Sequence, residues 1–191
     1  MKRQTLTIAL SILGICLLSV VSAAAQDVFK VNYFANNGVT GAPDATLRVT
    51  NPGTSNGNLC AMVYVFDNDQ QMAECCGCIT TPDGLRTFSV KNNLTSNPLT
   101  GAVPNNGDIK IVSAAVNNSP CDATANVTPT ATLRAWVTHI QNKVGTAYPV
   151  TETESSDATL SAGELASLQA DCYFVNRLGS GRGICSCGTG D

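Results

Sequence analysis

The sequence contains few of the side chains on which enzymes and nucleic-acid-binding proteins most depend. Charged residues make up 13% of the 191 positions, His139 is the only histidine and Trp136 the only tryptophan. No Gly-x-Ser-x-Gly elbow is present, and the glycine-rich residues 179–183 follow a predicted helix, whereas a phosphate-binding loop precedes one. Lysine and arginine are not clustered, so a nucleic-acid partner is not expected. We therefore expect no catalytic residues and no cofactor.

Long apolar runs are also rare, and the one at the N-terminus has the features of a targeting segment. Lys2 and Arg3 precede an apolar stretch at residues 8–21, which three alanines close. This order is typical of a cleaved signal peptide. We expect residues 1–25 to be removed and the protein to be secreted, either extracellular or at the cell surface, or periplasmic if the source is bacterial. Cys16 leaves a lipoprotein open, although the bulky Ile15 before it disfavours that processing.

The remaining chain, residues 26–191, is expected to form a single disulfide-rich domain. Removing Lys2 and Arg3 leaves nine basic against fourteen acidic residues, so the net charge changes from -3 to -5. No further apolar run is long enough to span a bilayer, so no membrane span is expected after signal removal.

The number and spacing of the cysteines are the most informative features of the predicted mature chain. Eight remain: Cys60, Cys75, Cys76, Cys78, Cys121, Cys172, Cys185 and Cys187. An even number in an exported chain predicts four disulfides, although the sequence alone cannot assign the pairs. Bonds within the Cys75–Cys76–Cys78 cluster would be strained. We expect the cluster to bond outward, to Cys60, Cys121, Cys172 and the pair Cys185 and Cys187.

Short strand-like segments separated by turn residues occupy most of the chain. They lie at residues 28–34, 46–50, 59–66, 85–90, 109–116 and 133–140, and residues 151–157 form a loop or an edge strand. Such spacing without intervening helices predicts a mainly β fold, an antiparallel immunoglobulin-like β-sandwich. The likeness concerns architecture and implies no function.

Residues 59–66 are apolar throughout, whereas a strand with one wet face would alternate. Both faces of this strand must therefore be covered. The expected cover is a C-terminal helix at about residues 161–178, because Ser161 and Glu164 form a capping box. Its apolar stripe comprises Leu165, Leu168, Cys172 and Val175. A partner subunit is the alternative cover. The glycine- and cysteine-rich tail beyond the helix needs Cys185 and Cys187 to hold it in place.

A polar segment follows the central strand and is the candidate binding loop. It consists of Asp67, Asn68, Asp69, Gln70 and Gln71. Asp67 and Asp69 are weak calcium candidates, because Met72 stands where a calcium loop needs glycine and Cys78 where it needs glutamate. We expect a solvated turn without metal, and we expect the cysteine cluster after it to form a second turn that anchors the helix and the tail.

These features together predict an exported, non-catalytic protein: a structural, adhesive or binding module held by about four disulfides. Its polar side chains are mainly Asn, Thr, Ser and Gln, which cannot be tuned for proton transfer. The partner is unknown; a protein or glycan at the cell surface and self-assembly all fit. A secreted hydrolase with a site dispersed over loops is one alternative, using His139 or the acids at residues 152–157. A metal-binding or thiol-exchange protein that uses the cysteine clusters is the other.

Overall fold

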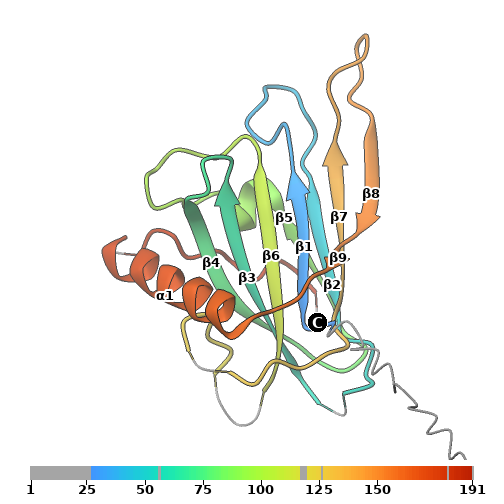
Figure 1. The fold of residues 1–191 in the computed structure, drawn as a ribbon. Helices are drawn as coiled ribbons and strands as arrows, with labels where there is room; N and C mark the ends of the chain where they lie inside the picture. Colours follow the sequence, from blue (N-terminus) through green and yellow to red (C-terminus); the bar gives the residue numbers. More distant parts are fainter. Residues whose placement is uncertain (1–26, 56, 117–119, 126, 180, 191) are drawn as a thin grey trace, which may run out of the picture.

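Two antiparallel sheets and one C-terminal helix make up the part of the chain that the computed structural model describes (Figure 1). This part comprises residues 27–55, 57–116, 120–125, 127–179 and 181–190, so the predicted signal peptide lies outside it. The first sheet has the order β4-β3-β6-β1-β9 and the second the order β5-β2-β7-β8. The strands are β1 (Phe29–Phe34), β2 (Thr46–Thr50), β3 (Leu59–Asp67), β4 (Met72–Thr80), β5 (Leu85–Ser89), β6 (Gly107–Ala115), β7 (Arg134–Ile140), β8 (Val150–Glu154) and β9 (Ser156–Asp157). A short π-helix, η1 (Val90–Leu94), follows β5, and α1 is Ala162–Leu178.

The central strand β3 is buried on both faces, as its sequence predicts. It pairs along its length with β4 on one side and β6 on the other. Ala61, Val63 and Val65 pack between the two sheets, whereas Met62 and Tyr64 belong to a second apolar layer on the outer face. Leu168, Cys172 and Val175 of α1 lie in that second layer. The helix therefore contributes to the cover of this outer face, as predicted, together with the segment around Ala123, whose carbonyl accepts a hydrogen bond from the Tyr64 hydroxyl.

The cysteine cluster lies in a strand, so the prediction of a turn there is wrong. Cys75, Cys76 and Cys78 belong to β4, which pairs with β3 through a bulge near Val65. Glu74 and Gly77 interrupt the apolar pattern that would reveal a strand, but pairing with β3 satisfies the backbone of this segment. A Cβ at Gly77 would overlap the carbonyl group of Cys121. The glycine is therefore required because another part of the chain crosses directly over β4.

Four cysteine pairs have disulfide geometry: Cys60–Cys121, Cys75–Cys172, Cys76–Cys185 and Cys78–Cys187. The cluster bonds outward to the helix and the tail, as expected. The expectation that Cys60 and Cys121 also bond to the cluster is wrong. These two bond to each other, because the segment containing Cys121 lies on the outer face of the first sheet, where Tyr64 Oη donates to the Ala123 carbonyl over 2.9 Å. Four such pairs fit a disulfide-stabilised extracellular protein.

One flank of the sandwich is closed by residues 183–190, which run from the edge of β4 to the edge of β5. We name it the cysteine flank. The N–H of Cys75 donates to the Gly183 carbonyl over 2.9 Å, and Thr87 and Thr189 exchange two hydrogen bonds of 2.9 Å. A glycine-rich tail is thus held by disulfides and by backbone pairing to both sheets.

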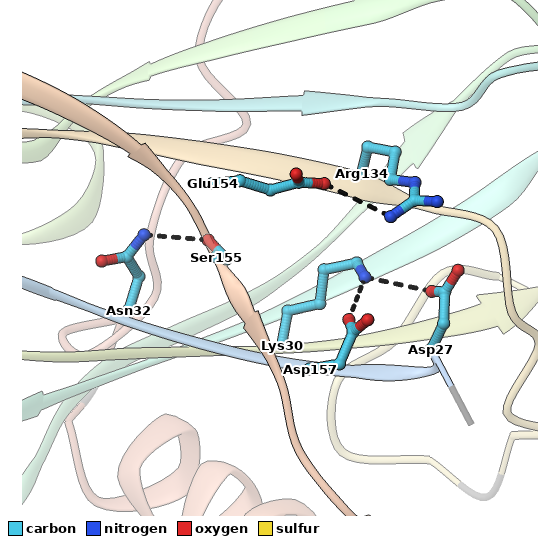
Figure 2. A network of polar contacts seen from close by, with 7 residues as sticks. All are labelled: Asp27, Lys30, Asn32, Arg134, Glu154, Ser155 and Asp157. Atoms are coloured by element: carbon cyan, nitrogen blue, oxygen red, sulfur yellow. Dashed lines mark hydrogen bonds and ion pairs between the residues drawn. The ribbon is translucent and has the colours of Figure 1, made fainter. Parts of the chain in front are cut away.

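The opposite flank, which we name the polar flank, is closed by side chains and by the passage of the chain from β8 to β9. Lys30 is 1% exposed, and its Nζ lies 3.0 Å from Asp27 and 2.5 Å from Asp157 (Figure 2). Asn32 donates to the Ser155 hydroxyl over 3.1 Å. On this flank, ion pairs and hydrogen bonds hold the chain in place, as disulfides do on the cysteine flank.

Helix α1 begins as predicted but uses only half of the expected capping box. The Ser161 hydroxyl accepts the N–H of Glu164 over 3.0 Å. The Glu164 carboxylate instead binds Lys110 Nζ of β6 at 2.7 Å, which fastens the start of the helix to the first sheet. No helix among the described residues is both long and apolar enough to cross a membrane.

Candidate functional site

The candidate binding loop forms the tight turn between β3 and β4. Oδ1 of Asp67 accepts the N–H groups of Asp69 and Gln71, each over 2.9 Å. The N–H of Asp67 also donates to the Gln71 carbonyl over 3.0 Å, and Gln70 adopts a positive φ of 65°. The turn is therefore fixed by its own hydrogen bonds and by the two strands that it joins. Among the described residues, no group of three or more His, Cys, Asp or Glu side chains is placed to hold a metal ion.

Three surface depressions meet at this turn and share Asp67 and Gln70; together we name them the turn surface. The first, of about 340 Å³, lies between the turn, residues 99–102 and α1, where Phe174 lines it. The middle one, of about 380 Å³, extends over Phe66 and Lys110. The third, of about 380 Å³, extends to Tyr33 at the end of β1. Of the other predicted loop residues, Gln71 lines the first depression, Asn68 lines the third, and Asp69 lines none of the three.

Each depression is lined by an aromatic side chain, and two of these side chains are open to solvent. Phe174 is 58% exposed and Tyr33 50% exposed, and Phe66 is partly buried. The Tyr33 ring stacks on the His139 ring with 4.1 Å between centroids. Lys110 Nζ lies 5.0 Å from the centre of the Phe66 ring. Two of the three rings are therefore held in position by a neighbouring side chain.

The polar side chains of the turn surface are carboxylates and amides. They are Asp67, Asp108, Asp171, Asn68, Gln70, Gln71 and Asn106, with Thr100 in the first depression. Among the lining residues Lys110 is the one cation, and its ammonium group is already bound to Glu164. The surface is thus weakly acidic and rich in groups that accept hydrogen bonds or both donate and accept them.

The structure does not bring His139 and the acids at residues 152–157 into one cleft. His139 is 1% exposed, and its Nε2 bonds the Thr153 hydroxyl over 2.7 Å. Burial lowers the pKa of His139, and the Tyr33 backbone partly offsets this. Glu152 pairs with Arg48, while Asp157 binds Lys30. Each of these groups has a structural partner.

Sequence reasoning missed one titratable side chain of unusual character. Glu74 is fully buried; its Oε1 accepts the N–H of Asn97 over 2.6 Å, and its Oε2 has no hydrogen-bond partner among the described residues. Burial raises the pKa of Glu74 to about 7, although the hydrogen bond from Asn97 acts in the opposite direction. The signal that could have revealed it is a lone acid directly before the cysteine cluster.

The turn itself was found from the sequence, but its partners were not. Phe174, Asp171 and Tyr33 come from segments far from residue 67, and no local pattern links them to it. Phe174 did carry a signal, because it lies off the buried stripe of α1 formed by Leu168, Cys172 and Val175. Its position in the sequence therefore predicts a ring that faces solvent, as the structure shows.

Comparison with known proteins found no matching family model, no matching curated protein and no matching solved structure. Function must therefore be argued from the geometry of the turn surface.

Proposed function

We propose that this protein is an exported, non-catalytic binding module and that the turn surface is where it binds its partner. One observation carries the proposal: three depressions converge on Asp67 and Gln70, within a turn fixed by its own hydrogen bonds. Loops held by a rigid scaffold are common binding sites, and a first depression of about 340 Å³ is within the usual range for ligand pockets.

The four disulfides and the predicted signal peptide support an extracellular or cell-surface location. Within the same proposal, the sandwich is grouped by architecture with immunoglobulin-like exported modules, in which loops at one end commonly mediate recognition.

The use of the titratable side chains supports binding instead of catalysis. His139, Lys30 and Asp157 each hold a structural contact within the polar flank. The carboxylates at the turn surface have no histidine or second buried acid beside them among the residues that line it. Histidine is the side chain that most often performs general acid–base catalysis, and none is among the described residues that line the turn surface.

The experiment that tests the proposal uses protein purified after export with its own leader. Fluorescently labelled protein is applied to arrays of cell-surface glycans and extracellular proteins, and its turnover of ester, peptide and glycoside substrates is measured in parallel. We expect binding without turnover. Gln70→Gly, which suits the positive φ at this position, should abolish binding, whereas Gln141→Ala on the exposed β7–β8 loop should not. Steady turnover, or binding that ignores Gln70→Gly, would contradict the proposal.

A further inference from the structure

We infer that the turn surface binds a neutral oligosaccharide, with one sugar ring in each of its three depressions. The inference rests on the proposed function and adds to it the chemical class of the ligand.

The aromatic side chains give the first reason. A pyranose ring has an apolar face of C–H groups that packs on an aromatic face, and the exposed rings of Tyr33 and Phe174 line the two outer depressions. The partly buried Phe66, with Lys110 over its ring, adds an apolar contact in the middle depression. Packing of the fold does not explain the exposure of Phe174, since its neighbour Val175 is the residue that faces the core. An aromatic ring that is half exposed at the edge of a depression offers its apolar face to a ligand.

The polar side chains give the second reason. Sugar hydroxyl groups both donate and accept hydrogen bonds, so they are best matched by amides together with carboxylates. Gln70 and Asp67 line all three depressions, and Asn68, Gln71, Asn106, Asp108 and Asp171 distribute further planar groups among them. A single apolar ligand would leave most of these groups unpaired.

Charge decides which oligosaccharides fit. Three carboxylates line the surface, and Lys110 is already neutralised by Glu164 at 2.7 Å. An anionic glycan would therefore meet repulsion and no free cation among the lining residues. The three depressions are adjacent, since Asp67 and Gln70 line all of them, and this arrangement suits linked sugars better than one monosaccharide.

The site is also arranged before the ligand arrives. His139 supports one face of Tyr33, and Asp67 is fixed by the N–H groups of Asp69 and Gln71. Little conformational entropy is lost on binding when the contacting groups are already ordered.

The test is isothermal titration calorimetry of the exported, disulfide-bonded protein with defined sugars. The neutral probes are cellohexaose, maltohexaose, mannohexaose and chitohexaose, and a sulfated heparin hexasaccharide is the anionic probe. We expect at least one neutral hexasaccharide to bind, and to bind about tenfold or more tightly than its monosaccharide. Phe174→Ala and Tyr33→Ala should each weaken it by about tenfold or more, whereas Phe174→Tyr should retain binding.

Tyr173→Ala is the matched control, because Tyr173 is 50% exposed on the same helix and lines none of the three depressions. Thermal unfolding of each variant verifies that it is folded. Failure of every neutral hexasaccharide, tighter binding of heparin, or equal losses from Tyr173→Ala and Phe174→Ala would overturn the inference. If an arrayed protein binds in a Gln70-dependent manner and no sugar does, the inference fails while the proposed function stands. Turnover of any substrate instead defeats the proposed function itself.

Discussion

The cysteine flank and the polar flank both close the space between the two sheets, but they use different chemistry. On the cysteine flank, two disulfides and the backbone of residues 183–190 join β4 to β5. On the polar flank, Lys30 with two carboxylates and Asn32 with Ser155 hold β1 near the β8–β9 crossing (Figure 2). Covalent bonds resist salt and pH but yield to reductant, whereas ionic contacts do the reverse.

The two flanks also differ in the buried acid–base group that each contains. Glu74 lies on β4 at the cysteine flank, and His139 lies on β7 at the polar flank. Burial favours the neutral form of both, which raises the pKa of the acid and lowers that of the base. The two flanks should therefore respond to pH with opposite signs.

The largest effect is expected from removing both disulfides of the tail. Because Cys75–Cys172 already ties α1 to β4, the first tail disulfide closes a loop of only about 15 residues and stabilises by about 3 kcal/mol. The second closes a still smaller loop and adds about 2 kcal/mol. Replacing Cys78 and Cys187 by serine should lower the unfolding free energy by about 2 kcal/mol, and replacing Cys76 and Cys185 as well should lower it by about 5 kcal/mol in urea titrations. If the variant that lacks only Cys78–Cys187 were as unstable as the variant that lacks both tail disulfides, the two bonds would not contribute separately, contrary to this prediction.

The next largest expected effect is the dependence of stability on pH that Glu74 causes. Between pH 4.5 and about 7 the folded protein keeps a proton on this carboxyl group that the unfolded chain has released, so stability falls as pH rises. The total loss is roughly 3 kcal/mol. Glu74→Gln, which stays neutral, should remove this decline when denaturant midpoints are compared at pH 5 and pH 8. An unchanged decline in the variant would mean that Glu74 is ionised in the folded protein.

His139 should produce a smaller effect of the opposite sign. Its pKa is lowered by burial, so below 6.5, the ordinary value, the unfolded chain binds more protons and stability falls as pH falls. Above that value the contribution of His139 is fully present. In the Glu74→Gln background, thermal stability should rise from pH 5 to pH 7, and adding His139→Gln should flatten the rise. A rise that persists in the double variant would assign it to other groups.

Lys30→Met is expected to change stability least, within about 1 kcal/mol. The buried ammonium is lost, but Asp27 and Asp157 retain 24% and 33% side-chain exposure and can be hydrated instead. Lys30→Ala should cost about 2 kcal/mol more than Lys30→Met, because it also leaves a cavity. Chemical denaturation of the two variants at low and high salt measures the difference. A large loss in Lys30→Met would show that the polar flank depends on this charge as strongly as the cysteine flank depends on its disulfides.

The sequence revealed features that depend on a local pattern. The unbroken apolar run of β3 required cover on both faces, and the spacing of Leu168, Cys172 and Val175 identified the helix that provides part of the cover of the outer face. The turn after β3 was recognisable because acids and amides followed a buried strand.

Features that depend on contacts between distant segments could not be predicted from the sequence. Strand β4 forms because β3 pairs with it, although Glu74 and Gly77 break its apolar pattern. The Cys60–Cys121 bond follows from a chain crossing that no spacing encodes. The turn surface likewise needs Phe174 and Tyr33, which only the packing of α1 and β1 brings beside Asp67.

The tail that closes the cysteine flank has a consequence for biosynthesis. Cys185 and Cys187 lie 109 residues after the cysteines to which they bond. At usual translation rates, β4 waits about 5 to 20 seconds for these partners. During that interval the edge of β4 and the thiols of Cys76 and Cys78 lack the partners that cover them in the folded protein. Yield in a heterologous host should therefore depend on how well the host shields this edge while the chain is still being made.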